Sequence, residues 1–296
     1  MKNTKIIITV ATIILVVISY YSYTLINNVA VAESPARVEP SFNKTVPSSS
    51  VAQSSPQTDH RMSIWIPKPR TSWQWQLSTP VDQSVNAQMY DIDMFSNDAG
   101  VVQSLHDKGR HVVCYISAGS VEDWRPDAGQ FPDEVKGNDY AGWPGEKWLD
   151  IRRIDVIGPI MERRLDECQA KGFDAVEPDS INAYTQDTGF SLSAEDQLTY
   201  NIWWANAAHK RGLSIGLKED PEQAKELVAH FDWALDEECF EFGGCEKMLP
   251  FITAGKAVFN SEYALSTGQF CSEANKLNFN SIRKHKELDV YRETCR

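Results

Sequence analysis

The stretch GFDAVEPDSIN, residues 172–182, decides our interpretation of the fold. Residues 173–176 predict a short buried strand, and two carboxylates, Glu177 and Asp179, follow it directly. Pro178 has no backbone N–H to donate, so we expect the sheet to stop at this residue. A buried strand that ends in acids, between two long helical segments, is typical of a (β/α)8 barrel, which presents functional groups at the C-terminal ends of its strands.

Seven more strand-and-helix units can be assigned around this stretch. Gly172 is a typical helix-ending residue, and Ser193 with Asp196 predicts a capping box at the start of a helix. Helical spacing predicts helices over residues 98–108, 155–171, 193–210, 221–230 and 247–254. The predicted strands are residues 71–77, 89–94, 111–117, 147–150, 173–176, 213–218, 232–238 and 256–261. Eight strands alternating with helices predict a (β/α)8 TIM barrel, and periodicity alone leaves a doubly wound sheet as the alternative.

The first 60 residues differ in composition from the rest of the chain. Lys2 and Lys5 lead into an apolar run over residues 6–26, which indicates export and is long enough to cross a bilayer. A small-residue cleavage site at residues 30–32 follows, so residues 1–32 are either a cleaved signal peptide or an uncleaved signal-anchor. Residues 33–60 are rich in Ser, Pro, Thr and Gln, which predicts a flexible linker. A single folded domain is therefore expected over residues 61–296, at the cell surface or outside the cell.

The overall charge restricts the classes of partner. The chain has 296 residues, a formal net charge of −12 and a pI of about 5.0. Nucleic-acid binding is disfavoured, because neutralising phosphates requires clustered Lys and Arg, whereas a cationic or neutral substrate is favoured. No nucleotide motif and no CxxC-like ligand cluster is present, so we expect no cofactor and no metal, although an acidic barrel rim is able to hold Ca²⁺. We expect a monomer.

An even number of cysteines in an exported chain predicts disulfide bonds. Proximity in the sequence favours a bond between Cys239 and Cys245 and a second between Cys271 and Cys295. Cys114 and Cys168 are then left either to pair with each other or to remain buried thiols.

Carboxylates gather at the ends of the predicted strands. A long loop over residues 117–144 follows the third strand, and loops of this length are often functional. The acids at or just after strand ends are Asp91, Asp93, Glu122, Asp150, Glu177, Asp179, Asp220, Asp236, Glu237, Glu238 and Glu262. Glycoside hydrolysis needs one carboxylic acid to protonate the leaving oxygen and one carboxylate to attack the anomeric carbon or activate water. An acidic barrel rim with aromatic residues and Lys218 therefore favours this chemistry over a set of helix caps and surface ion pairs.

Four motifs in one order resemble a known family. They are CYISAGSVEDWRPD at residues 114–127 with Phe131-Pro132, GFDAVEPD at 172–179, GLK at 216–218 and EECF at 237–240. Together they are similar to glycoside hydrolase family 114, the endo-α-1,4-polygalactosaminidases, from about Trp73 to Tyr263. The resemblance implies a (β/α)8 barrel that cleaves α-1,4-linked, galactosamine-containing polysaccharide.

Residue roles follow from the matching motifs. The resemblance implies Asp179 as nucleophile or base and Glu237 as general acid, with the reverse division also open. Glu177 would shape the site or pack as a buried acid, and Trp124 and Trp75 would be sugar platforms or core residues. The residues expected to bind substrate are Glu177, Tyr115, Ser117, Asp93, Lys218, Tyr184, Trp124 and Glu262.

The chain departs from the family pattern at three positions. Ser180 and Glu219 stand where the pattern often has Asn, and Asn182 stands where it often has Asp. The implied catalytic pair is unchanged, and contacts to the sugar are expected to differ. The leading hypothesis is a secreted or membrane-tethered endo-acting glycoside hydrolase whose partner is a galactosamine-rich polysaccharide. The alternatives are a non-catalytic polysaccharide-binding barrel and a glycosidase for another α-linked sugar.

Overall fold

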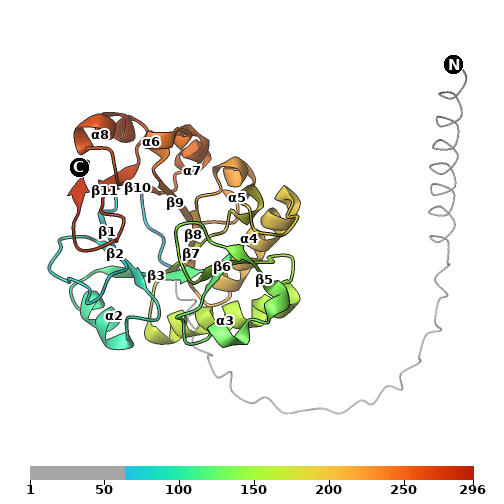
Figure 1. The fold of residues 1–296 in the computed structure, drawn as a ribbon. Helices are drawn as coiled ribbons and strands as arrows, with labels where there is room; N and C mark the ends of the chain where they lie inside the picture. The colour runs from blue at the N-terminus through green and yellow to red at the C-terminus, as the bar shows by residue number, and fades with distance from the viewer. Residues whose placement is uncertain (1–63) are drawn as a thin grey trace, which may run out of the picture. The chain divides into compact units, whose positions relative to one another are not determined.

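Eight parallel strands form the centre of the molecule. The computed structural model describes residues 64–296, so the predicted segments 1–32 and 33–60 lie outside the described residues. The main sheet has the order β1-β2-β3-β7-β8-β9-β10-β11-β12, in which β1 to β11 are parallel to their neighbours and β12 is antiparallel. Its strands are β1 (Trp73–Gln76), β2 (Met89–Asp93), β3 (His111–Ser117), β7 (Ala175–Asp179), β8 (Ser214–Lys218), β9 (Trp233–Glu237), β10 (Val258–Glu262), β11 (Asn280–Arg283) and β12 (Glu293–Thr294). The sheet curls into a barrel with helices outside it (Figure 1), which confirms the (β/α)8 prediction.

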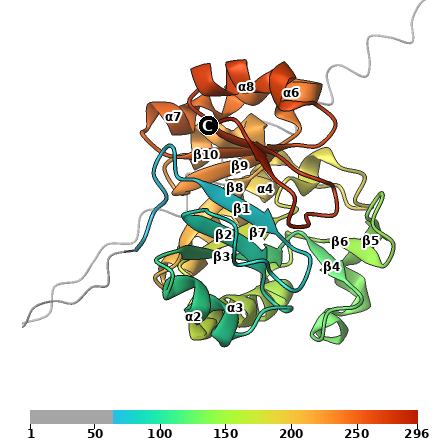
Figure 2. The same cartoon turned by 90° about the vertical axis from the view of Figure 1, so that its left-hand side faces the viewer.

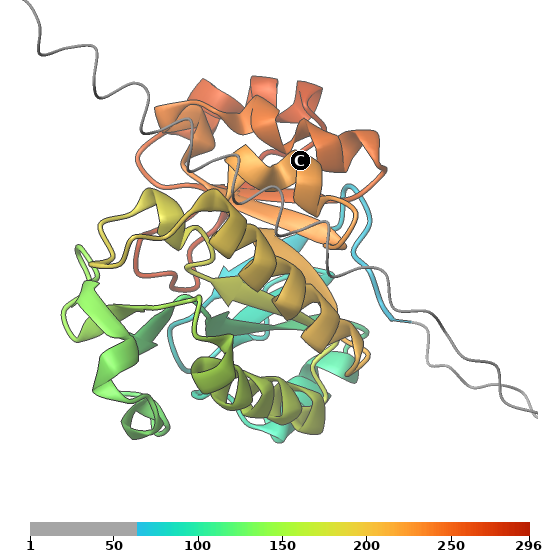
Figure 3. The ribbon, with the colours of Figure 1, turned by 90° about the vertical axis from the view of Figure 1, so that its right-hand side faces the viewer.

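The helices lie on the outer face of the sheet, as Figure 3 shows for the yellow-green α3 and the gold α4. Both helices begin and end close to where the sequence predicts. Gly172 follows α3 with a left-handed φ of 90°, and the capping box of Ser193 and Asp196 is present at the start of α4. The helices are α2 (Ala99–His106), α3 (Ile154–Lys171), α4 (Ala194–His209), α5 (Ala224–Leu227), α6 (Cys239–Phe242), α7 (Leu249–Thr253) and α8 (Thr267–Lys276). Within residues 64–296, no helix combines the length and apolar character needed to cross a membrane.

One predicted strand requires correction, and one barrel strand was not predicted. Residues 147–150 do not form the fourth barrel strand: β6 (Glu146–Leu149) pairs antiparallel with β4 (Ser120–Glu122) and β5 (Lys136–Asp139) in a separate small sheet beside the barrel (Figure 2). The eighth barrel strand is instead β11, which the sequence analysis missed. Its four residues, NSIR, carry too little alternation to be separated from the surrounding tail.

The strand of the opening stretch continues past the proline. The ladder of β7 with β8 is recorded only for Ala175 and Val176, whereas its ladder with β3 continues to Asp179. Successive residues of a strand direct their backbone groups to opposite neighbours, so the missing N–H of Pro178 affects only one side. The Asp179 carbonyl accepts from the backbone N–H groups of Ala118 and Gly119, at 2.9 and 3.1 Å. The prediction that the sheet stops at Pro178 is therefore right on the β8 side and wrong on the β3 side.

The interior of the barrel is filled by large side chains. Trp73, Trp75, Trp233 and Phe259 form one apolar cluster there, separate from the core between the sheet and the helices. Gly216 on β8 makes room for the Trp233 indole, because a Cβ at this glycine would stand 2.4 Å from the ring. The filled interior closes the barrel at its centre and leaves the C-terminal ends of the strands as the place for a cleft.

A C-terminal segment bridges the seam between β1 and β11. The Trp73 indole N–H donates to the Asn280 carbonyl at 2.8 Å, which ties β1 to β11. Beyond β11, the backbone N–H groups of Leu77 and Ser78 donate to the Leu288 carbonyl, at 3.0 and 3.2 Å. Residues 284–290 thereby reach the C-terminal rim next to the end of β1.

Three disulfides lie within the described residues. The predicted bonds Cys239–Cys245 and Cys271–Cys295 are confirmed. Of the two possibilities for the remaining cysteines, the structure has the bond: Cys114 of β3 is joined to Cys168 of α3.

Candidate active site

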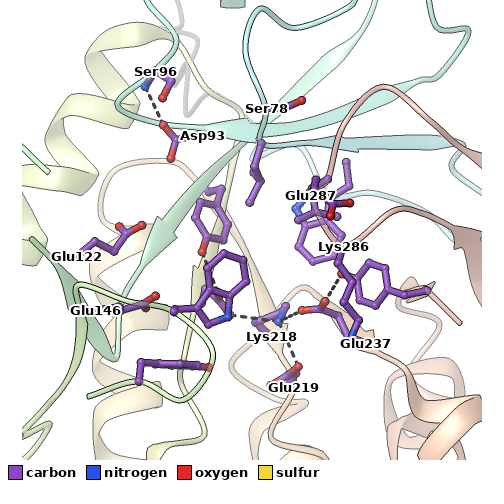
Figure 4. Close-up of a pocket in the computed structure, with 18 of the residues that line it drawn as sticks. Ser78, Asp93, Ser96, Glu122, Glu146, Lys218, Glu219, Glu237, Lys286 and Glu287 are labelled. Atoms are coloured by element: carbon purple, nitrogen blue, oxygen red, sulfur yellow. Dashed lines mark hydrogen bonds and ion pairs between the residues drawn. The ribbon is translucent and has the colours of Figure 1, made fainter. Parts of the chain in front are cut away.

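Three side chains meet at the ends of three neighbouring strands. Asp179, Lys218 and Glu237 are the last residues of β7, β8 and β9. The Lys218 Nζ lies 3.1 Å from Asp179 Oδ1 and 2.6 Å from Glu237 Oε1, and the lysine is 2% exposed. Figure 4 shows this lysine between the two sides of the cleft. One buried ammonium therefore holds both carboxylates that the sequence analysis selected.

The surroundings of Asp179 favour its ionised form. Burial works to raise the pKa of this carboxyl, but the positive charge of Lys218 and two hydrogen bonds outweigh it, and the pKa lies below its ordinary value. The Tyr115 hydroxyl donates to Oδ2 at 2.8 Å, and the backbone N–H of Ser180 donates to Oδ1 at 2.8 Å. Asp179 is thus a carboxylate at neutral pH, as a nucleophile or base must be.

Glu237 has a partner that the sequence analysis missed. The Tyr263 hydroxyl donates to Glu237 Oε2, while Lys218 occupies Oε1. The sequence analysis chose Glu262, one residue earlier. Side chains alternate along β10, and Phe259 points into the barrel, so Tyr263 shares the inward face and Glu262 does not. That alternation is the signal that could have identified Tyr263.

The backbone turns sharply after each of the three rim residues. Ser180, Glu219 and Glu238 have φ values of 63°, 55° and 54°, in the left-handed region that side-chain-bearing residues seldom occupy. Each such residue costs about 1 kcal/mol or more, and such conformations cluster at functional sites. Gly119 packs against the first turn, since a Cβ there would stand 1.8 Å from the Ser180 carbonyl oxygen. The rim residues are therefore positioned by a constrained backbone.

A cleft of about 500 Å³ opens above these residues. Figure 4 shows Glu122 and Glu146 on one side and Glu237, Lys286 and Glu287 on the other. Eight carboxylate side chains and three basic side chains line it: Asp93, Glu122, Glu146, Asp179, Glu219, Glu237, Glu238 and Glu287, with Arg125, Lys218 and Lys286. The excess of acids favours a ligand that is neutral or cationic.

The acids on the first side are of two kinds. Arg125 binds Asp93 at 2.7 Å and Glu122 at 2.5 Å, so both carboxylates have a cation. Glu146 has no such partner: it accepts from the Ser120 hydroxyl, and burial raises its pKa to about 7. Ser120 in turn contacts the Ser117 hydroxyl, which places Ser117 behind Glu146.

A second carboxyl pair lies one layer below the rim. Asp91 and Glu177 each precede a rim acid by two residues, so they face the barrel interior about 7 Å deeper. Both are fully buried, and neither has a hydrogen-bond donor from another protein group among the described residues. Burial raises the pKa of Asp91 to about 7 and that of Glu177 well above its ordinary value, and the two carboxyls interact with each other. At least one of them therefore carries a proton at neutral pH.

The predicted substrate-binding residues divide into two groups. Asp93, Tyr115, Trp124 and Lys218 line the cleft. The other four, Ser117, Glu177, Tyr184 and Glu262, are not among the residues that line it. Glu262 accepts from the Phe240 N–H at 3.0 Å and from the Asn260 amide at 3.1 Å, behind β10. Trp75 is 1% exposed and lies beneath Lys218, whose Nζ is 5.8 Å from the ring.

Two of the departures from the family pattern contact each other. The Asn182 side-chain amide donates to Glu219 Oε2 at 2.7 Å, and Glu219 Oε1 is 3.3 Å from Lys218 Nζ. Asn182 stands where the family pattern often has Asp, and Glu219 stands where it often has Asn. Glu219 adds a third carboxylate to Lys218.

Paired acids at the C-terminal ends of the strands of a (β/α)8 barrel are typical of glycoside hydrolases. The model of glycoside-hydrolase family GH114 matches residues 54–296, and the chain belongs to this family. The protein is therefore a glycoside hydrolase, which confirms the leading hypothesis at the level of reaction class. No match was found among curated proteins.

Solved structures resemble the described domain. Ega3 from Aspergillus fumigatus, in complex with galactosamine, is 37% identical, with a TM-score of 0.75 over 80% of this chain and 100% of the other. The glycoside hydrolase domain of PelA from Pseudomonas aeruginosa is 11% identical, with a TM-score of 0.59 over 75% of this chain and 97% of the other. An α-galactosidase from Thermus thermophilus is 11% identical, with a TM-score of 0.51 over 74% and 59%. The last two support the fold alone.

Proposed function

We propose that this protein is an endo-acting hydrolase of α-1,4-linked, galactosamine-containing polysaccharide, with Asp179 and Glu237 as its catalytic acids. The observation that carries the proposal is the pair of carboxylates held by one buried lysine at the ends of β7 and β9. Glycoside hydrolysis needs two carboxyl groups in one cleft, and this pair fits that need. The galactosamine in the Ega3 structure and the acidic lining of the cleft support an amino sugar as the substrate.

The environment of Asp179 supports a division of labour between the two acids. Asp179, kept ionised by Lys218 and Tyr115, attacks the anomeric carbon or removes a proton from the attacking water. Glu237 protonates the glycosidic oxygen as it leaves. Positive charge develops on the sugar ring in the transition state, and the acidic residues that line the cleft stabilise it.

The remaining expectations concern the location of the enzyme. Residues 1–32 would direct export, either as a cleaved signal or as an anchor, and residues 33–60 would tether the domain. The three disulfides support an oxidising environment outside the cytoplasm. The polysaccharide would then meet a monomeric enzyme at the cell surface or in the medium.

A reducing-end assay tests the proposal. The parent, Asp179→Asn and Glu237→Gln are incubated with α-1,4-galactosamine polymer, and new reducing ends are counted. We expect release by the parent and a loss of roughly 10²-fold or more in each variant, since each removes a proton-transfer or attacking group. Asp133→Asn, which changes an acid whose side chain is 99% exposed, is the matched control. Polymer binding without release by the parent would favour a non-catalytic binding protein, and release that survives both substitutions would place the chemistry on other residues.

A further inference from the structure

Two large aromatic side chains at the cleft are exposed to solvent. Trp124 and Trp143 are 52% and 54% exposed, and both line the same cavity as Asp179 and Lys218. The other large exposed apolar residues of the described part, Ile66, Phe242 and Val290, do not line it. An indole exposed at the wall of a cleft gains free energy when an apolar surface covers it. These two tryptophans therefore require an explanation that the core does not provide.

The small sheet holds both tryptophans on adjoining turns. Trp124 follows β4 and Trp143 precedes β6, and these two strands pair with each other. The turns are joined where the Asp123 N–H donates to the Gly145 carbonyl at 2.9 Å. The turn of Trp143 is further fixed by backbone hydrogen bonds from Trp143 to Tyr140 and from Glu146 to Trp143, both at 3.1 Å. The two indoles therefore belong to one ordered surface.

This surface is continuous with the candidate catalytic centre. Tyr140 and Glu146, at the two ends of the Trp143 turn, also line the cavity. The negative charge of Asp179 contributes to raising the pKa of both side chains, after burial, so both lie near that carboxylate. Tyr140 is supported from behind by Trp148, with ring centroids 4.3 Å apart and nearly parallel planes. A ligand that lies against the tryptophans would extend directly to Asp179.

We propose that Trp124 and Trp143 form a distal subsite, which binds sugar residues of the polymer away from the bond that is cleaved. The inference rests on the proposed function, because an endo-acting enzyme holds a chain that continues beyond the cleavage point. Sugar rings have apolar C–H faces that stack on indoles, and the acids beside this surface suit the ammonium groups of galactosamine. The occupant is thus a stretch of the same polysaccharide whose next residues lie over Asp179 and Glu237.

The experiment compares substrates of different length. Trp124→Ala, Trp143→Ala and the double variant are assayed on α-1,4-galactosamine polymer and on the shortest oligomer that the parent cleaves. We expect KM for the polymer to rise roughly fivefold for each tryptophan, as loss of about 1 kcal/mol of stacking predicts. Because the subsite binds ground state and transition state alike, kcat stays within about twofold, and KM for the shortest oligomer is unchanged. Trp143→Phe should restore most of the affinity for the polymer.

The control and the contrary outcomes are distinct. Phe242→Ala removes an aromatic ring that is 76% exposed but does not line the cleft, so all its constants should equal those of the parent. The subsite is overturned when the parent cleaves polymer and the double variant does so with unchanged KM. It is also overturned when KM rises equally for polymer and shortest oligomer, since the tryptophans would then act at the catalytic centre. A parent that cleaves no galactosamine polymer overturns the proposed function, and with it the identity of this occupant.

Discussion

The barrel holds two pairs of acids, one above the other, whose surroundings differ. The rim acids Asp179 and Glu237 contact the ammonium of Lys218 directly. The carboxyl oxygens of Asp91 and Glu177, one layer below, have no hydrogen-bond partner among the described residues, and the charge of Lys218 only partly offsets the effect of burial on their pKa values. Burial opposes ionisation at both levels. The pKa of Asp179 nevertheless lies below its ordinary value, and that of Asp91 is raised to about 7. The comparison teaches that partners, rather than depth, decide which carboxyl carries charge in this barrel.

The difference also assigns distinct roles to the two layers. A carboxylate that attacks or removes a proton must be ionised at working pH, and only the rim layer supplies the cation that this requires. In the lower pair, protonation of at least one carboxyl reduces the buried negative charge, which would be costly if both groups were ionised. Lys218 is therefore the residue on which the comparison depends.

Lys218→Met is the change with the largest expected effect. It removes the ammonium but keeps an unbranched side chain, so burial acts unopposed on Asp179 and the pKa of Asp179 rises. Activity requires ionised Asp179 and is lost when this carboxyl takes up a proton on acidification. With a higher pKa that loss occurs at a higher pH, so the acidic limb of the pH profile moves upward. We expect kcat/KM at neutral pH to fall roughly 10²- to 10³-fold, the usual cost of removing a preorganised electrostatic partner. The measurement is the pH profile of kcat/KM on galactosamine polymer.

Lys247→Met is the matched control for this change. Lys247 also pairs with a carboxylate, Glu222 at 2.5 Å, but on the surface away from the cleft. Its profile should equal that of the parent. If the acidic limb of Lys218→Met lies at the same pH as that of the parent, groups other than Lys218 keep Asp179 ionised. The contact with Lys218 would then not explain the difference between the two layers.

Tyr115→Phe should give a smaller shift in the same direction. The variant removes the hydroxyl that donates to Asp179 Oδ2 at 2.8 Å and leaves Lys218 in place. A hydrogen bond to a charged group contributes about 1.5–3 kcal/mol, so we expect the pKa of Asp179 to rise by roughly one unit and kcat/KM to fall roughly tenfold. Tyr90→Phe is the control, since that hydroxyl donates to the Val85 carbonyl at 2.6 Å, outside the cleft. If the acidic limb does not move in Tyr115→Phe, the Tyr115 hydroxyl has no measurable effect on the pKa of Asp179, and Lys218 is the dominant cause of its lowering.

The comparison shows how much of this fold the sequence could predict. Long helices with caps, and strands ending in acids, lie where the pattern places them, because periodicity and capping are local properties. The fourth predicted strand was assigned to the wrong sheet, and the last barrel strand, β11, was not predicted. Residues 147–150 alternate like a strand and are one, but which sheet they join is set by distant partners on β4 and β5. β11 is defined by pairing with β10, which a four-residue segment does not reveal alone.

The candidate site was predictable only in part. Asp179, Glu237 and Lys218 follow strands, so their convergence is a consequence of barrel topology. Tyr263 was missed because its selection requires knowing which side chains of β10 point into the barrel. Trp143 was missed because its selection requires knowing the path of a long loop. The opposite pKa shifts of Asp179 and Asp91 could not be predicted from the sequence, since they depend on where one ammonium lies relative to both.

Asp91→Asn tests the lower layer and has the smallest expected effect on activity. Asp91 has a pKa raised from 3.8 to about 7 in the folded protein, so the folded state holds its proton more tightly than the unfolded chain. Its contribution to stability is therefore complete below about pH 4 and is lost as the pH rises through about 7. An amide does not titrate, so the free energy of unfolding of the variant should fall less steeply across this window. Each pKa unit corresponds to about 1.4 kcal/mol, and urea unfolding at several pH values measures the slope.

The control for this slope is again Asp133→Asn, whose exposed side chain should leave the pH dependence of the parent unchanged. Glu146, Asp220 and Asp236 also have raised pKa values, so the parent slope will not vanish in Asp91→Asn, and only the difference between the two slopes is diagnostic. Identical slopes would mean that Asp91 is ionised in the folded protein at neutral pH. The ammonium of Lys218 would then stabilise ionised carboxylates in both layers. The two layers would differ in geometry but not in protonation.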